Sequence, residues 1–215
     1  MIQITNEDNM ELMARYEDNY FDLAIVDPPY GIGIGKIKKW ATSKKCLAKS
    51  NEYKTGDWDN AIPDKDFFIE LQRVSKNQII WGGNYFTDFL YINRCWLAWD
   101  KIQDLDQFSD FELAWTSFNK VCKKFKRGSK GGFLTNNTID HKIHPTQKPV
   151  DLYRWQLQNY AKQGDLILDT HGGSMSIAIA CDKEGFDLDI CEIDNKYFET
   201  GQKRYNEFKQ QVTMF

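Results

Sequence analysis

Residues 164–180, GDLILDTHGGSMSIAIA, contain the pattern that decides the fold. An apolar run over 166–168 ends at Asp169, two glycines follow, and the start of a helix comes next. Strand, glycine turn and helix in this order form the unit at which an open α/β sheet binds a nucleotide-like ligand beyond its carboxyl edge. The stretch therefore predicts a ligand site at the edge of a sheet.

Similar apolar runs recur along the chain, with helical periodicity between them. The predicted strands are 2–4, 23–26, 78–81, 95–99, 112–115, 166–168 and 188–191. The predicted helices are 64–74, 149–164, 176–185 and a last one after Asp194. Several runs lack polar alternation, which is typical of strands covered on both faces. Strands that alternate with helices predict an α/β fold with an open, mostly parallel sheet, in a single domain over 1–215.

Composition indicates a soluble globular chain. Its 215 residues are 41% hydrophobic and 27% charged, which excludes disordered, collagenous and membrane classes. The opening MIQITNEDNM has neither a basic start nor an apolar run, so we expect a cytoplasmic protein without a membrane partner. The five cysteines form no Cys-x-x-Cys pair and are expected to be reduced thiols in the core. The three histidines lack metal-ligand spacing, so no metal is expected.

Basic charge gathers in two segments although the net charge is −3. Residues 31–63 and 119–148 are long, polar and rich in lysine, and loops of this length are usually functional. Solvated loops are the alternative for either segment alone. Because both flank a candidate site, we expect them to contact nucleic-acid phosphates. The residues expected to do so are Lys36, Lys38, Lys39, Lys123, Lys124, Lys126, Arg127 and Lys130.

A second stretch, DLAIVDPPYGIG at 22–33, ends a buried strand with an aspartate and two prolines. An aspartate at a strand end normally accepts from the N–H two residues on, but here that residue is Pro29, which has none. The prolines also keep Asp27 and Pro28 out of a helix. We therefore expect the Asp27 carboxylate and the Pro28 carbonyl to project without partners, with Tyr30 at stacking distance.

Two rigid acceptors beside an aromatic ring suit a planar group that carries an NH₂, such as the edge of adenine or cytosine. The nitrogen of this amine is a poor nucleophile because its lone pair is delocalised into the ring. Accepting both of its hydrogens favours the tetrahedral, nucleophilic form as an electrophile approaches. The motif thus predicts stabilisation directed at a transition state. A rigid proline turn with a surface tyrosine is the alternative.

On these residues the sequence resembles the amino-group DNA methyltransferases that use S-adenosylmethionine, whose catalytic motif reads Asp/Asn/Ser-Pro-Pro-Tyr/Phe/Trp. The segments IIWGGNYF at 79–86, WLAWDK at 96–101, FSDFELAWTS at 108–117 and HPTQKP at 144–149 are similar to further motifs of that family. The catalytic half precedes the cofactor half, as in the circularly permuted β group. The resemblance covers nearly the whole chain and implies the Rossmann-like sheet of the class I methyltransferases.

The resemblance implies direct methyl transfer from S-adenosylmethionine to an exocyclic amine of a base flipped out of double-stranded DNA. Asp27 and the Pro28 carbonyl would bind and polarise the amine, and Tyr30 would stack on the base. An aspartate at the first motif position favours the N6 amine of adenine over the cytosine amine. Methylation of the cytosine amine or of RNA, and a non-catalytic nucleic-acid-binding relative with the same fold, are the alternatives.

The cofactor half carries its own candidate residues. Gly172 and Gly173 allow backbone contact with the methionine part, Asp169 faces its ammonium, and Glu192, after a second strand, accepts from the ribose hydroxyls. Ser174 completes the turn.

Further cofactor residues come from the resemblance. It implies that Thr146, Gln147 and Lys148 lie near the cofactor's carboxylate and that Asp8 meets its adenine amine, although an acid that starts a helix is an equal reading of Asp8. The glycine turn departs from the family's Asp-Pro-Phe-x-Gly-Ser-Gly, since Thr170, His171 and Met175 replace the proline, the phenylalanine and the second glycine. This departure raises the question of cofactor affinity.

The space for target recognition, from Phe118 to Lys148, is short. Three arrangements are compatible with it. The protein could read a short site, form a homodimer as many relatives do, or borrow the specificity of a partner. A cognate restriction endonuclease could accompany it.

Overall fold

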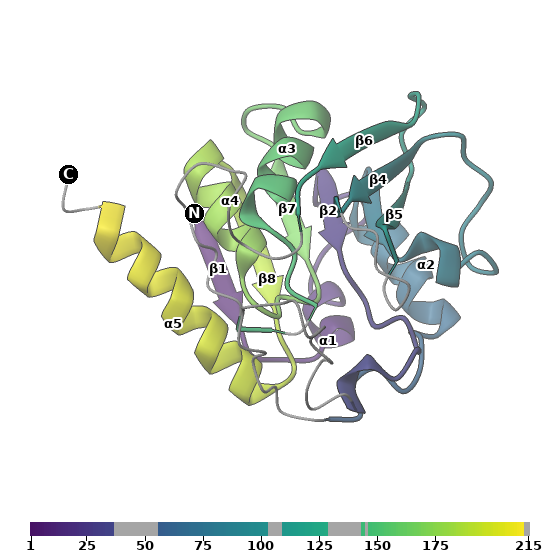
Figure 1. Cartoon of the computed structure of the whole chain (residues 1–215). Coiled ribbons are helices and arrows are strands. Elements are labelled where there is room, and N and C mark those ends of the chain that lie inside the picture. Colours follow the sequence, from purple (N-terminus) through teal and green to yellow (C-terminus); the bar gives the residue numbers. More distant parts are fainter. Residues whose placement is uncertain (37–55, 103–108, 129–142, 145, 213–215) are drawn as a thin grey trace.

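The protein, seen as a computed structural model, is an α/β domain described over residues 1–36, 56–102, 109–128, 143–144 and 146–212 (Figure 1). Its strands are β1 (Ile2–Thr5), β2 (Leu23–Val26), β3 (Gln78–Trp81), β4 (Trp96–Asp100), β5 (Phe111–Thr116), β6 (Lys123–Lys126), β7 (Leu166–Asp169) and β8 (Asp187–Cys191). Its α-helices are α1 (Asn9–Met13), α2 (Lys65–Val74), α3 (Val150–Tyr160), α4 (Ser176–Glu184) and α5 (Asn195–Val212). Two short 3-10 helices are η1 (Ile34–Lys36) and η2 (Gly83–Tyr85).

The strands form one sheet in the order β1-β8-β7-β2-β3-β5-β4-β6. Only β5 pairs antiparallel with its neighbours β3 and β4, whereas every other pairing is parallel. The open, mostly parallel sheet predicted from the sequence is therefore confirmed. Among the described residues no helix is both long and apolar enough to cross a bilayer.

Alternate residues of each central strand serve two separate cores. Ile25 and Ile79 face the cluster that includes α3 and α4, while Ala24 and Ile80 face the cluster that includes α1 and α2. In Figure 1, α3, α4 and α5 lie on one side of the sheet and α1 and α2 on the other. Because both faces are covered, these strands read as continuous apolar runs.

The chain reverses its direction of travel across the sheet between β2 and β7. From β2 the chain continues through α2 to β3 on one side, and from β7 it continues through α4 to β8 on the other. Ligands of open α/β sheets bind at such a switch point, outside the carboxyl ends of the strands. Asp27 directly follows β2 and Asp169 ends β7, so both candidate acids lie at this crevice.

Two local expectations need correction. Residues 123–126, expected within a long loop, form strand β6, which pairs with β4 and extends the sheet. Cys122, expected in the core, is exposed, and its thiol donates to the Arg94 carbonyl, whereas Cys95, Cys181 and Cys191 are buried as expected. Cys46 lies outside the described residues.

Gly82, between β3 and η2, holds a conformation that ties the sheet to the predicted catalytic motif. Its φ is +71°, and a Cβ built there would lie 2.2 Å from Cε1 of Tyr30. A side chain at this position would therefore be strained and would also push the tyrosine ring from its place.

We predict that Gly82→Ala destabilises the protein more than Gly164→Ala does. Gly164 also has a positive φ, +92°, but nothing within 4 Å of its Cβ position, so its substitution isolates the backbone cost of roughly 1–2 kcal/mol. Steric displacement of Tyr30 should add about 1–3 kcal/mol in Gly82→Ala. Urea unfolding measures both free energies, and equal losses would contradict the predicted contact.

Candidate active site

The Asp27 carboxylate is partnered on both oxygens. The Tyr30 hydroxyl donates to Oδ1 over 2.7 Å, and the Lys148 ammonium lies 2.5 Å from Oδ2. The expectation of an unpartnered carboxylate is therefore wrong. Pro29 provides no backbone donor, as expected, but Lys148 from a distant segment takes its place. Each oxygen keeps a second lone-pair direction, so the carboxylate can still accept from a substrate N–H.

Lys148 is the buried charge that organises this site. Only 1% of its side chain is exposed, and its Nζ lies 3.1 Å from Oε2 of Glu112 and 3.0 Å from the Tyr30 hydroxyl. Lys101, which follows β4, pairs with the other Glu112 oxygen over 2.7 Å. The ammonium expected near a cofactor carboxylate is thus placed against Asp27 of the Asp-Pro-Pro-Tyr motif and Glu112 of β5.

Burial and these ion pairs shift the site's pKa values. Burial raises the pKa of Asp27 above its ordinary value, more than Lys148 lowers it. Burial also acts to raise the pKa of Glu112, but the ammonium groups of Lys148 and Lys101 outweigh it and hold that pKa at about 2. For Lys148, burial is outweighed by Asp27 and Glu112, and the pKa is raised. Glu112 and Lys148 are therefore charged at neutral pH.

Glu112 and Lys101 were not predicted as site residues from the sequence. Glu112 begins the ELAW run, where it reads as the first residue of a strand, and no residue spacing connects it with Asp27. Because β5 is antiparallel to its neighbours, its first residues lie at the edge where the parallel strands end. This topology brings Glu112 to the carboxyl edge.

The second predicted acceptor, the Pro28 carbonyl, has no hydrogen-bond donor among the residues that the structure describes. Pro28 itself is buried. This half of the expectation agrees with the structure: one main-chain acceptor, in the residue after Asp27, has no donor among the described residues.

Tyr30 already has an aromatic partner. The Tyr85 ring, from η2, lies 5.0 Å from the Tyr30 ring centre at an interplanar angle of 15°, and 41% of Tyr85 is exposed. Burial raises the pKa of Tyr30 well above its ordinary value, so its hydroxyl stays protonated and donates to Asp27. A base that stacks on this face of Tyr30 must displace Tyr85 or insert beside it.

Asp59 supports the loop after the motif and was also missed from sequence. It is buried, its Oδ1 accepts from the N–H groups of Tyr30 and Gly31 over 2.7 and 2.9 Å, and its Oδ2 accepts from Ile34 N–H over 2.8 Å. Three backbone donors that the prolines leave outside regular structure are thereby satisfied. The polar run DWDN at 57–60 was the available signal, but it read as loop sequence.

The second half of the crevice holds Asp169 and Glu192. Asp169 is 2% exposed; its Oδ1 accepts from His171 N–H over 2.9 Å, and its Oδ2 has no partner in the described part of the chain. Burial raises the pKa of Asp169 to about 8. Glu192 accepts from Gly173 N–H over 2.7 Å and from Asp194 N–H over 2.9 Å, which orients its carboxylate along the turn.

The altered glycine turn places a non-glycine residue, Met175, in the left-handed region of backbone conformation. Met175 adopts a φ of +57°, the conformation suited to the glycine that the family pattern has there, and its side chain is fully buried. A Cβ on Gly172 would lie 2.9 Å from the Met175 methyl carbon, and one on Gly201 of α5 2.7 Å from its Cγ. Two glycines thus make room for the methionine inside the core.

The remaining candidate cofactor residues use their polar groups locally. Asp8 is the N-cap of α1 and accepts from Met10 N–H over 2.8 Å. Gln147 accepts from Ile143 N–H over 2.9 Å, and the Thr146 hydroxyl lies 3.0 Å from Nδ1 of His144. Ser174 is buried and its hydroxyl pairs with that of Ser176.

The predicted basic contacts divide into three groups. Lys36, Lys123, Lys124 and Lys126 are exposed, although Lys124 lies 3.7 Å from an Asp100 oxygen. Arg127 is buried, and its guanidinium donates to Asp151 of α3 over 2.8 Å, which removes it from the surface expected for phosphate contact. Lys38, Lys39 and Lys130 lie outside the described residues.

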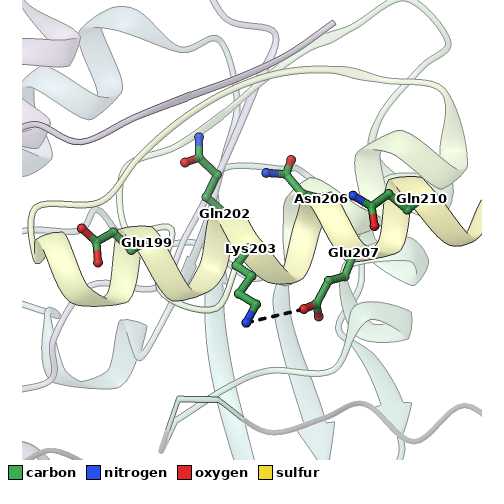
Figure 2. A pocket seen from close by; sticks show the side chains of 6 residues that line it. All are labelled: Glu199, Gln202, Lys203, Asn206, Glu207 and Gln210. Carbon is green, nitrogen blue, oxygen red and sulfur yellow. Dashed lines mark ion pairs between the residues drawn. The ribbon is translucent and has the colours of Figure 1, made fainter.

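A shallow hollow elsewhere on the surface runs along α5 (Figure 2). Its lining side chains all come from that helix, and they include the Lys203 and Glu207 pair at 3.9 Å. With one helix, polar groups and opposed charges, it lacks the convergent acids of the crevice.

The comparison with protein families decides the identity. The family model described as DNA methylase, N6_N4_Mtase, matches residues 64–203. The chain belongs to this DNA methylase family. As the family's designation states, its members act at N6 or N4 amino groups, and this DNA methylase is thus an amino-methyltransferase. The match begins after the Asp27 motif, so that motif is assigned from its sequence and its geometry.

Relatives and solved structures agree with this assignment. The DNA methylase is 22% identical to the Type II methyltransferase M.HpaI of Haemophilus parainfluenzae, over 91% of this chain and 71% of that protein. It is 24% identical to the Type II methyltransferase M2.MboI of Moraxella bovis, over 94% and 90%.

The fold is shared with solved methyltransferases. The structure of the M1.HpyAVI-SAM complex has a TM-score of 0.59 at 19% sequence identity, and the match covers 95% of this chain and 100% of that chain. The structure of the cytosine-N4-specific PvuII DNA methyltransferase has a TM-score of 0.60 at 12% sequence identity, and the match covers 98% of this chain and 92% of that chain.

We predict that Asp59→Asn loosens the loop after the catalytic motif. The amide that replaces one oxygen cannot accept from a backbone N–H, and a buried donor left unsatisfied costs roughly 1–3 kcal/mol. Hydrogen exchange should show faster exchange at Tyr30, Gly31 and Ile34. The exposed Asp57→Asn, two residues away, is the matched control, and equal protection in both variants would refute the role of Asp59.

We predict that Asp169→Asn flattens the pH dependence of stability. The folded pKa of about 8 exceeds the unfolded value of 3.8, so the folded protein holds a proton that the unfolded chain has released between these values. The free energy of unfolding of the ligand-free protein therefore falls as pH rises through this window, by about 1.4 kcal/mol per unit from this group. Urea unfolding at several pH values measures the slope; an unchanged slope in the variant contradicts the assignment.

Proposed function

We propose that this DNA methylase transfers the methyl group of S-adenosylmethionine to the N6 amine of adenine in double-stranded DNA. The observation that carries the proposal is the placement of two acceptor sets at one crevice. Asp27 and the Pro28 carbonyl lie on the β2 side of the switch point, and Asp169 and Glu192 lie on the β7 and β8 side. An amine bound by the first set would face a cofactor bound by the second.

The first set would act on the amine. The Asp27 carboxylate and the Pro28 carbonyl each accept one N–H, which withdraws the nitrogen lone pair from the ring and makes it available for attack. This interaction is strongest when the nitrogen is tetrahedral, so it stabilises the transition state more than the ground state. The raised pKa of Asp27 also suits it to hold the proton that the methylated nitrogen releases.

The second set fits the cofactor. The Oδ2 of Asp169 has no hydrogen-bond partner in the described residues and is suited to an ammonium, and Glu192 retains lone pairs for two ribose hydroxyls. S-adenosylmethionine would supply an electrophilic methyl group there. At neutral pH Asp169 would release its proton when an ammonium binds, because the positive charge favours the carboxylate.

The target base would reach this crevice by flipping. Its amine is engaged in the duplex, and extrusion costs a few kcal/mol, part of which stacking on an aromatic ring returns. Tyr30 and the half-exposed Tyr85 supply the aromatic surface. The exposed Lys36, Lys123 and Lys126 would contact phosphates, so DNA affinity should fall with salt.

The aspartate at the first motif position supports adenine as the base. The names of the relatives, Type II methyltransferases, support a place in a restriction–modification pair, in which a cognate endonuclease would cut the same site. A DNA substrate of this kind also favours a cytoplasmic location.

We predict that Asp27→Ala abolishes methyl transfer while the fold and cofactor binding persist. The loss of one acceptor at the reacting amine should lower kcat by at least roughly 100-fold. Folding should survive, because Lys148 keeps Glu112 as a partner at 3.1 Å. The assay uses unmethylated genomic DNA with methyl-labelled S-adenosylmethionine and identifies the product nucleoside by mass spectrometry.

The exposed Asp88→Ala is the matched control and should transfer methyl groups at the wild-type rate. The expected product is N6-methyladenine. N4-methylcytosine would overturn the base assignment, label in RNA rather than DNA would overturn the polymer, and full activity in Asp27→Ala would overturn the role of the carboxylate. If calorimetry detects no heat of binding for S-adenosylmethionine, the result would favour the alternative that this protein is a non-catalytic relative with the same fold.

A further inference from the structure

Glu112 is a second carboxylate in contact with the ammonium that holds Asp27. Its Oε2 lies 3.1 Å from Nζ of Lys148, while Oδ2 of Asp27 lies 2.5 Å from the same nitrogen. The two acids come from different strands, Asp27 from the end of β2 and Glu112 from the start of β5. Two carboxylates therefore share one ammonium, and only Asp27 belongs to the Asp-Pro-Pro-Tyr motif.

Lys148 has opposing effects on the proposed reaction. It stabilises the charged form of Asp27, which must be a carboxylate to accept from an amine. The same ammonium at 2.5 Å draws electron density from the carboxylate, which weakens it as an acceptor and as a proton holder. If Lys148 paired with Asp27 alone, Asp27 would stay charged but would be held tightly by the ammonium.

Glu112 can weaken the Lys148–Asp27 ion pair because it is already within hydrogen-bond distance of the ammonium. Its other oxygen is tied to Lys101 over 2.7 Å, which fixes the carboxylate in place. The two acids and the two lysines sum to zero charge. When Lys148 moves toward Glu112 it stays paired with a carboxylate, and Asp27 keeps the Tyr30 hydroxyl and gains an N–H of the amine as donors, so no buried charge loses all of its partners, which would be costly.

We propose that Glu112 is a positioning residue for the methyl transfer: it takes over the Lys148 ammonium when Asp27 turns to the target amine. This inference rests on the proposed function. Glu112 acts through Lys148 and does not itself touch the amine. The Tyr30 hydroxyl, 3.0 Å from Nζ and 2.7 Å from Oδ1 of Asp27, keeps the two groups aligned during the exchange.

The charged and titratable groups around Asp27 define what a pH profile would report. Lys148, which precedes α3, and Tyr30, which follows β2, contact Asp27 directly, whereas Glu112, the second residue of β5, contacts Lys148. Tyr153 of α3 and Asp169 of β7 interact with Asp27 electrostatically at longer range. Of these, Glu112 raises the pKa of Asp27 and Lys148 lowers it. Removal of the Glu112 charge therefore has a defined direction.

The experiment compares Glu112→Gln with the wild-type protein in steady-state methyl transfer to unmethylated genomic DNA across pH. In Glu112→Gln, Lys148 pairs with Asp27 alone. We expect kcat to fall by roughly 10- to 100-fold. The acidic limb of the kcat profile should move to lower pH, because the pKa of Asp27 falls when a neighbouring negative charge is lost. Cofactor binding, measured by calorimetry, should stay at the wild-type value.

Two further variants separate positioning from simple stability. Lys101→Gln breaks the other ion pair of Glu112 but leaves its charge for Lys148, so the acidic limb should not move to lower pH. Glu112→Asp restores the charge and should return the limb toward its wild-type position. Urea unfolding of all three variants shows how much activity loss follows from unfolding.

The outcomes distinguish this inference from the function on which it rests. A wild-type protein that transfers no methyl group to DNA would overturn the proposed function. An active wild type with an unshifted acidic limb in Glu112→Gln would overturn the positioning role alone. The positioning role would also be overturned if the acidic limb of the kcat profile shifted equally in Lys101→Gln and Glu112→Gln. The shift would then follow from disruption of the cluster of two acids and two lysines.

Discussion

The structure of the proposed catalytic end depends on the pairing of one buried ammonium. Lys148 is 1% exposed, and a charge in such a place costs several kcal/mol unless acceptors surround it. Its acceptors come from the end of β2 and the start of β5, and the lysine itself precedes α3. Three segments far apart in the chain must therefore converge at one point, which holds the acid of the motif in a defined orientation.

The topology of the sheet supplies the other half of this constraint. Parallel strands end at one edge, which brings Asp27, Asp169 and Glu192 together, and the reversal of travel between β2 and β7 leaves a crevice between them. The antiparallel β5 begins where its neighbours end, so it contributes its first residues to the same edge. A catalytic edge of a parallel sheet thus gains an acid from a strand of opposite direction.

Much of the fold and part of the site were predictable from residues alone. Apolar runs located the central strands because strands covered on both faces cannot tolerate polar alternation, and the positions of Asp27 and Asp169 followed from the strand ends. Strand β6 was missed because KKFK carries too many charges to read as a strand, although it only has to pair at the sheet edge. Arg127 was assigned to the surface because a basic run gives no sign of a partner such as Asp151.

The α/β architecture and the projecting Asp-Pro-Pro-Tyr motif could be predicted from the residues, because periodicity and proline geometry act over a few neighbouring residues, and the order of the two halves followed from the family resemblance. Only the tertiary structure decided that the Asp27 carboxylate is held by Lys148 and Tyr30, that Glu112 shares the ammonium, and that Asp59 secures the following loop. Rules of local backbone geometry predict only the hydrogen-bond donors that lie within one turn of the chain. The partners of a buried charge come from wherever the fold brings an opposite charge close enough to replace water.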